Sequence, residues 1–191
     1  MKSAIKDIKF RRRAKSITDY KKRLALVKGG IDRVVVRRSN RRIIGQVIRY
    51  SPKGDIVIAH ADSFELEKLG WPSHSNRPTA YLTGLLLSRK AGKEASNDHI
   101  LDIGLASPVR LSVPFVFAKG CADGGLKIRN SISIDEKVYN CSNSEYISKM
   151  KAKDAAKYKN HYSSYKDIGG LNKSFEEAKS NILKGATLSS D

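Results

Sequence analysis

The chain has 191 residues and a formal net charge of +18, most of which lies at one end. Residues 1–53 hold 18 Lys and Arg against three acidic residues, which gives +15, whereas the other 138 residues hold 19 against 16, which gives +3. This asymmetry predicts a surface that binds a polyanion, nucleic acid first and anionic membrane second. No apolar run approaches the about 18 residues of a membrane span, and no apolar segment follows the basic N-terminus, so we expect neither a membrane helix nor a secretory signal.

The length and the cysteine content narrow the class of protein further. A chain of this length suffices for one domain with a sizeable core plus extensions. Its two cysteines, Cys121 and Cys141, belong to no CxxC pair. We therefore expect two free thiols in a reducing cytosol rather than a structural disulfide.

Residues 1–30 form a basic segment with little apolar content. Phe10, Ile17 and Leu24 lie seven residues apart, with too few apolar residues between them for a helix that packs into a core. The pattern predicts an extended or partly helical arm that stops at Gly29-Gly30. Alone in solution it should be largely disordered, because it cannot bury enough apolar surface to offset the entropy of ordering.

Three β-branched runs follow the arm, at Val34–Arg37, Ile43–Tyr50 and Ile56–Ala61. The turn signal between the first two is Ser39-Asn40, where Asn tolerates the positive φ of a tight hairpin. The second turn signal, Ser51–Gly54, has proline at the position that suits a type I turn. Together these features predict a three-stranded antiparallel meander.

The middle of the chain predicts helices that pack against this sheet. Apolar residues between Tyr81 and Leu86 are spaced three and four apart, and Gly92 stands where a C-terminal glycine belongs. The segment "HILDIGLASP" reads as a short buried strand stopped by Pro108, and a second helix is expected over about Val113–Gly124. This order of elements is typical of an α/β sheet covered by helices.

From residue 133 onward the chain is rich in Lys, Ser and Tyr, with helical signals around Ser144–Tyr158 and Phe175–Leu183. We therefore predict an α/β fold: a mixed sheet built on the three-strand antiparallel meander plus a further strand, with helices packed against it. A basic RNA-binding arm (1–30) precedes this core domain (31–130), and a C-terminal helical extension (131–191) follows it.

Motifs of catalysis are scarce. There is no GxxxxGK[ST] phosphate loop and no GxSxG nucleophile elbow. The histidines fall at no metal-ligand spacing, with each other or with the cysteines, so no zinc site is expected; they are His60, His74, His99 and His161.

Two groups of polar residues resemble parts of a catalytic site. Asp98-His99 and Asp102 imitate part of a triad, but their position at a strand favours ordinary strand-end and turn residues. A metal-dependent nuclease would need several carboxylates converging on one face. Its only candidates show no spacing that indicates convergence; they are Asp55, Asp62, Asp102 and Asp123.

The arm carries the residues suited to binding nucleic acid. Arginine and lysine neutralise phosphates, and arginine also offers a planar fork for phosphate contact and base stacking. Tyr20 lies between basic residues and is placed to stack on an unpaired base, the mode that single-stranded RNA favours. Asp19 is expected to orient neighbouring Arg or Lys side chains. The alternative is a solvated or nuclear-import-like basic tail.

The predicted hairpin tip "RRSNRR", residues 37–42, is a second basic feature. A two-residue turn with two arginines on each side would project positive charge at one point, which favours RNA contact. The alternative is a solvated turn that keeps a sheet edge soluble.

The single tryptophan, Trp71, is expected by default to be buried against the sheet. Polar neighbours make an RNA-facing loop the alternative; they are Ser73, Ser75, Asn76 and Arg77.

Four segments give the sequence a family resemblance: "RRRAKSITDYKKRLALVKGG", "DRVVVRRSNRRIIGQVI", "GWPSHSNRPTAYLTGLL" and "LDIGLASP". In that order they resemble large-subunit ribosomal protein family eighteen, which binds 5S rRNA, in its archaeal and eukaryotic branch. The resemblance covers roughly residues 8–128. "NRPTAYLTGLL" followed by "LDIGL" is its most specific signal.

The resemblance implies an α/β core, 5S rRNA as main ligand and a place in the central protuberance of the cytoplasmic ribosome. Large-subunit rRNA and neighbouring ribosomal proteins are the further partners, with no catalysis, cofactor, metal, membrane or small-molecule substrate. Tyr81 belongs either to the family's RNA-facing surface or to the core at a helix start. RNA contacts are expected at Arg11, Arg12, Arg13, Lys15, Thr18, Tyr20, Lys22, Arg23, Arg37, Arg38, Ser39, Asn40, Arg41, Arg42, Lys53, Trp71, Asn76 and Arg77.

Two other functions share the basic charge. An RNA-processing or RNA-modifying enzyme would use the basic face to capture substrate, but it would need a carboxylate or nucleophile cluster beside that face. A nonspecific DNA-compacting protein would have no reason for the "RRSNRR" turn or the loop at residues 70–78.

Overall fold

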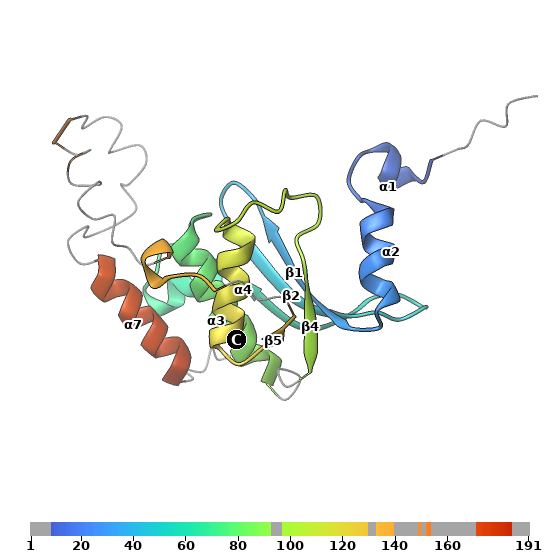
Figure 1. Ribbon diagram of the computed structural model, residues 1–191. Coiled ribbons are helices and arrows are strands. Elements are labelled where there is room, and N and C mark those ends of the chain that lie inside the picture. Colours follow the sequence, from blue (N-terminus) through green and yellow to red (C-terminus); the bar gives the residue numbers. More distant parts are fainter. Residues whose placement is uncertain are drawn as a thin grey trace, which may run out of the picture.

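The computed structural model describes residues 9–92, 97–129, 133–139, 149, 152–153 and 171–184. In this part of the chain a five-stranded sheet is covered on one face by α3 (Arg77–Ala91) and α4 (Val113–Asp123). The arm helix α2 (Tyr20–Lys28) stands on the other side of the sheet (Figure 1). The predicted α/β class is confirmed.

The sheet has the strand order β3-β2-β1-β4-β5. The strands β1 (Asp32–Arg38), β2 (Ile43–Arg49) and β3 (Ile56–Asp62) pair antiparallel, which confirms the predicted meander. The further strand β4 (Asp98–Asp102) runs parallel to β1, and the two-residue β5 (Lys127–Ile128) runs parallel to β4. The sequence did not indicate β5, because two residues are too few to show a period.

The two faces of the sheet differ in chemistry. In β1, Val34 and Val36 belong to the core that α3 and α4 cover. Because side chains alternate along a strand, Arg33, Val35 and Arg37 lie on the opposite face, where they line a groove beneath the arm. We call this second face the open face.

The covered face depends on glycines at three close approaches. A Cβ at Gly45 of β2 would lie 2.3 Å from the Phe117 ring of α4. Where the helices cross, a Cβ at Gly84 would lie 2.3 Å from the Phe117 carbonyl oxygen, and one at Gly120 would lie 2.2 Å from the Tyr81 carbonyl oxygen. The two helix backbones therefore touch, and no larger residue fits between them.

Helices α3 and α4 begin and end where the sequence predicts. The Asn76 carboxamide oxygen accepts a hydrogen bond from the Thr79 N–H (3.0 Å), an N-cap that fixes the start of α3. Gly92 ends α3 with a φ of 54°. Pro114 lies in the first turn of α4, where a missing N–H costs no helical hydrogen bond.

Two local predictions are wrong and a third is confirmed. The β1–β2 connection is a four-residue loop, because the last pair is Arg38 with Ile43, and Asn40 has no positive φ. Strand β4 ends at Asp102 rather than near Pro108, because the chain turns at Gly104, whose φ is 62°. The turn at residues 51–54 forms as expected, closed by a 3.0 Å hydrogen bond across its ends.

The described part of the C-terminal extension joins the same core. Helix α7 (Leu171–Lys184) confirms the helix expected at Phe175–Leu183 and packs against α3. The Phe175 ring lies edge-on to Trp71, with 5.7 Å between centroids. Of the helix expected over Ser144–Tyr158, only residues 149 and 152–153 are described, and Cys141 and His161 lie outside the described residues.

The short 3-10 helix η3 (Glu136–Val138) brings Tyr139 onto Tyr81, with ring centroids 4.1 Å apart. Tyr81 itself is 2% exposed, so it belongs to the core. Cys121 is a buried free thiol. None of the described helices is long and apolar enough to cross a membrane.

Candidate nucleic-acid interface

The arm consists of α1 (Arg11–Ala14) and α2, and neither helix has a buried residue. Lys, Arg, Leu and Ala make up most of α2, and these are good helix formers. The Asp19 carboxylate caps this helix by accepting the N–H of Lys21 (3.0 Å) and of Lys22 (3.1 Å). The partly helical arm is thus confirmed, but the role expected for Asp19 is wrong, since it orients backbone rather than cationic side chains.

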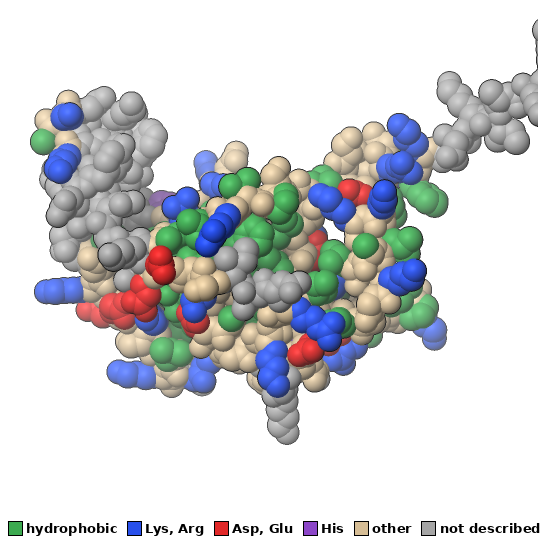
Figure 2. Space-filling view, viewed as in Figure 1, with side chains coloured by type: hydrophobic (Ala, Val, Ile, Leu, Met, Phe, Trp, Pro, Cys, Tyr) green, Lys and Arg blue, Asp and Glu red, His purple; other side chains and the backbone are tan. Residues whose placement is uncertain are grey.

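Most cations of the arm are exposed, as Figure 2 shows along its surface at the right of the view. Arg12 donates from Nε to the Thr18 hydroxyl (2.8 Å), a neutral partner that leaves its charge uncompensated. The Tyr20 ring lies 5.2 Å from that of Phe10. No ion pair or side-chain hydrogen bond with another described residue is formed by the exposed Arg11, Arg13, Lys15 and Lys22.

Two arginines at the β1–β2 connection, Arg38 at the end of β1 and Arg42 in the loop, are held in place by other side chains. Arg38 donates from Nε to the Ser75 hydroxyl (2.8 Å). Arg42 pairs with Asp62 (3.3 Å) and lies over the Phe64 ring, 4.5 Å from its centroid. Arg41 is exposed and pairs with no described residue, so it is the most available cation of this loop.

Ser39 and Asn40 are exposed between these arginines. Ser39 closes the loop twice, since its N–H and its hydroxyl donate to the Arg42 carbonyl oxygen (2.9 and 3.0 Å). The loop therefore presents Arg41 on a fixed backbone.

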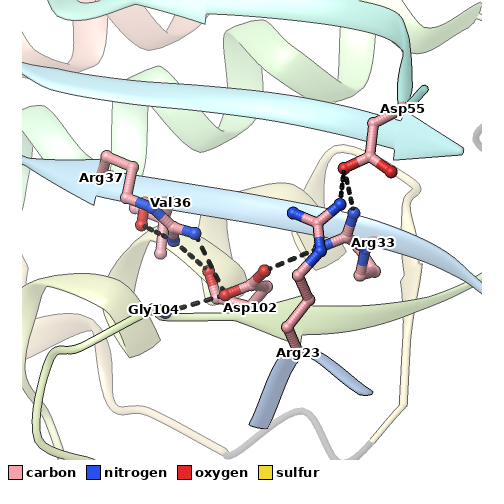
Figure 3. Close-up of polar contacts among 7 residues, drawn as sticks. All are labelled: Arg23, Arg33, Val36, Arg37, Asp55, Asp102 and Gly104. Carbon is pink, nitrogen blue, oxygen red and sulfur yellow. Dashed lines mark hydrogen bonds and ion pairs between the residues drawn. The ribbon is translucent and has the colours of Figure 1, made fainter. Parts of the chain in front are cut away.

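Three arginines and two aspartates alternate across the open face (Figure 3). Arg23 of α2 pairs with Asp55 (2.8 Å), which also pairs with Arg33 of β1 (2.8 Å). Arg33 reaches on to Asp102 at the end of β4 (3.1 Å), and Asp102 pairs with Arg37 (3.2 Å). We call these five residues the Arg–Asp ladder; it connects the arm, β1, the start of β3 and the end of β4.

The burial of the Arg33 side chain explains why aspartates lie on both sides of it. The Arg33 side chain is only 3% exposed, and a buried guanidinium is costly unless it is paired. Asp102 is fixed in turn by the Gly104 N–H (2.8 Å). Arg37 also donates to the carbonyl oxygens of Val36 (2.8 Å) and Asp102 (2.9 Å), so this predicted RNA contact is largely engaged within the protein.

A groove of about 750 Å³ lies between the arm and the open face. Its rim is basic, with Arg12 and Lys22 from the arm and Arg38 from the end of β1. Its floor is largely apolar, with Ile48 and Leu101 from the sheet. The groove therefore joins the arm and the end of β1 into one surface with positive edges.

The remaining predicted contacts divide between surface and core. Lys53 and Arg77 are exposed, at the β2–β3 turn and at the start of α3. Trp71 is fully buried and donates from Nε1 to the Thr79 hydroxyl (2.9 Å). The default expectation of burial is therefore confirmed, and the expected RNA contact of its side chain is wrong. Burial lowers the pKa of the nearby His74, against an opposing effect of Glu67, so this histidine adds no charge at neutral pH.

The residues that resemble parts of a catalytic site in the sequence have other roles in the structure. His99 is fully buried with no hydrogen-bond partner on either ring nitrogen, and Asp98 pairs with Arg129 (3.2 Å). Asp55 and Asp102 do converge, contrary to expectation, but the Arg33 guanidinium stands between them. Among the described residues, no group of three or more His, Cys, Asp or Glu is arranged to hold a metal ion.

The Arg–Asp ladder was not predicted from the sequence. The available signal was Arg33 itself, a charged residue directly before three valines in a strand. Such a residue predicts an acidic partner on the same face, but its partners Asp55 and Asp102 lie 22 and 69 residues away. No local pattern identifies them.

The comparison with known families agrees with this geometry. The family model described as ribosomal large subunit proteins 60S L5 and 50S L18 matches residues 6–100. That segment contains the arm, the meander and α3, and it ends within β4.

Proposed function

Because the chain belongs to the family of ribosomal large subunit proteins 60S L5 and 50S L18, we propose that it binds 5S rRNA and helps attach it to the large rRNA. In this proposal it acts in the central protuberance of the cytoplasmic ribosome, beside neighbouring ribosomal proteins. It acts as a structural component, without a catalytic step.

The observation that supports this most is a set of exposed cations, on the arm and on the β1–β2 loop, that have no partner among the described residues. Arg11, Arg13 and Lys15 on the arm, and Arg41 on the β1–β2 loop, are exposed without a partner among the described residues. Each cation that meets a phosphate releases counterions, which supplies affinity without sequence preference.

Selectivity for 5S rRNA would come from the shape of the RNA rather than from its charge. The arm and the end of β1 line one groove, and the β1–β2 loop directly follows that end of β1, so the spacing of their cations matches only some arrangements of phosphates. Unpaired bases would add contacts by stacking on Tyr20 or on arginine planes.

The test is binding of the purified protein to 5S rRNA, with an equal-length structured RNA as competitor, across a salt series. Preference for 5S rRNA that persists at moderate salt is expected. Equal and steeply salt-sensitive binding to both RNAs would contradict the proposal and leave a generic basic protein.

A further inference from the structure

One ion pair connects the arm to the rest of the described structure. Arg23 Nη2 lies 2.8 Å from Asp55 Oδ2. The other polar side-chain contacts of the arm, between Arg12 and Thr18 and around Asp19, stay within the arm. No residue of α2 is fully buried, and its apolar Leu26 and Val27 are only half-buried, so apolar burial supplies only part of its attachment.

The carboxylate of this ion pair is itself firmly held. Asp55 Oδ2 accepts from Arg33 as well as from Arg23, both at 2.8 Å. Arg33 is buried in the sheet and is fixed at its other nitrogen by Asp102. Asp55 is therefore a fixed anchor, whereas Arg23, 43% exposed, is the side chain that the anchor holds (Figure 3).

We infer that Asp55 is a positioning residue for RNA binding: its carboxylate holds α2 across the open face, so that the arm's cations are in place before RNA arrives. This inference rests on the proposed function. A preorganised arm loses less conformational freedom on binding than a free one. The acid thus strengthens RNA binding, although its own charge repels phosphate.

A simpler role for Asp55 would be to compensate the charge of Arg33. That role predicts a global effect, because an unpaired buried guanidinium destabilises the whole sheet. The positioning role predicts a local effect on α2, since Arg23 pairs with no other described acid. The two roles differ in where the structure opens: mainly in the sheet for charge compensation, and mainly in α2 for positioning.

Hydrogen exchange of the free, full-length protein measures this directly. In Asp55→Asn we expect several-fold faster exchange of the α2 amides and a smaller rise in β1, because Arg33 keeps Asp102 but loses one of its two acids. Arg23→Gln should release α2 in the same way while leaving the pair between Asp55 and Arg33 intact. Unchanged exchange in α2 of Arg23→Gln, or exchange that rises in the sheet of Arg23→Gln as much as in α2, would overturn the inference.

Binding to 5S rRNA supplies the second readout. Asp55→Asn should bind about three- to tenfold more weakly at every salt concentration, with the salt slope unchanged because the phosphate contacts still form. Asp55→Glu, which keeps the carboxylate, should recover part of the loss.

The matched control is Asp98→Asn, which removes the same charge from an exposed ion pair with Arg129. It should bind as tightly as the unaltered protein or more tightly. Equal or tighter binding by Asp55→Asn would overturn the positioning role. If the unaltered protein shows no preference for 5S rRNA, the proposed function fails, but hydrogen exchange still tests the anchor.

Discussion

The two faces of the sheet are stabilised in opposite ways. On the covered face, α3 and α4 meet through glycines so closely that a single added carbon would lie 2.2–2.3 Å from backbone atoms. On the open face, α2 buries none of its residues and is connected by one ion pair among the described side chains. The chain thus places its closest packing on one side of the sheet and the cationic arm on the other.

This difference separates two kinds of substitution. Changes on the covered face should alter the free energy of unfolding, because close-packed interiors do not accommodate added volume. Changes on the arm should alter RNA binding and leave unfolding unchanged, because exposed residues contribute little to stability.

The largest effect on stability is expected from Gly84→Ala. Its Cβ would lie 2.3 Å from the Phe117 carbonyl oxygen, so α3 and α4 must separate. The free energy of unfolding should fall by about 3 kcal/mol, measured by denaturant titration. Gly29→Ala at the end of the arm helix is the control, since its nearest contact is at 3.8 Å. An equal loss in both variants would contradict the distinction between the faces.

The largest effect on binding is expected when Arg11, Arg12 and Arg13 are replaced together by Gln. Each lost phosphate contact should reduce the slope of log affinity against log salt by about 0.7–0.9. Unfolding should not change, because none of the three is buried. An unchanged slope would mean that the arm does not touch phosphate.

A smaller effect on stability is expected from Tyr81→Phe. The Tyr81 hydroxyl donates to Asp123 (3.0 Å), and its removal should cost about 1 kcal/mol of unfolding free energy. Tyr20→Phe on the arm is the control and should lie within about 0.5 kcal/mol of the unaltered protein. A loss in Tyr20→Phe as large as in Tyr81→Phe would show that the arm is packed.

Tyr81 also makes stability depend on pH. Burial first, and then Asp123, raise its pKa above the ordinary 10.0. The unfolded chain therefore releases this proton more easily, so the contribution is complete below pH 10.0 and is lost as the pH rises above it. In Tyr81→Phe this decline should be shallower, although not absent, because the pKa of Tyr139 is raised as well. A decline of undiminished steepness would contradict the assignment.

The smallest effect, a few-fold, is expected from Arg41→Gln on the β1–β2 loop. It should weaken binding to 5S rRNA more than binding to an equal-length structured RNA, because the loop presents this cation in a fixed position. Arg110→Gln, at an exposed arginine outside the expected contacts and without a partner among the described residues, controls for the loss of one charge. Equal losses on both RNAs would count against a selective loop.

The sequence predicted those elements whose signals lie within a few positions of one another. The meander, α3, α4 and α7 were predicted from periodicity and turn residues, which act within a few positions. The arm's free cations were predicted as well, because a cation that stays in solvent needs no partner from a distant part of the chain. The loop at Asn40 was predicted less well, because hairpins of two and four residues share the same turn residues.

The ladder and the residue that covers Trp71 were beyond these local signals. Arg33 finds its acids 22 and 69 residues away, and Trp71 is covered by Phe175 of α7, across more than half of the chain. Such contacts depend on which strands become neighbours, and β4 lies beside β1 only through a crossover. The sequence therefore indicated which residues are charged, but not which of them are already paired.

The most direct test is hydrogen exchange of the protein with and without bound 5S rRNA. Slower exchange in the RNA complex is predicted for the amides of α1, α2 and the loop at residues 39–42, with no change in the crossing of α3 and α4. Slower exchange over α3, α4 and α7 with an unaffected arm would contradict the account, because RNA would then bind the packed face.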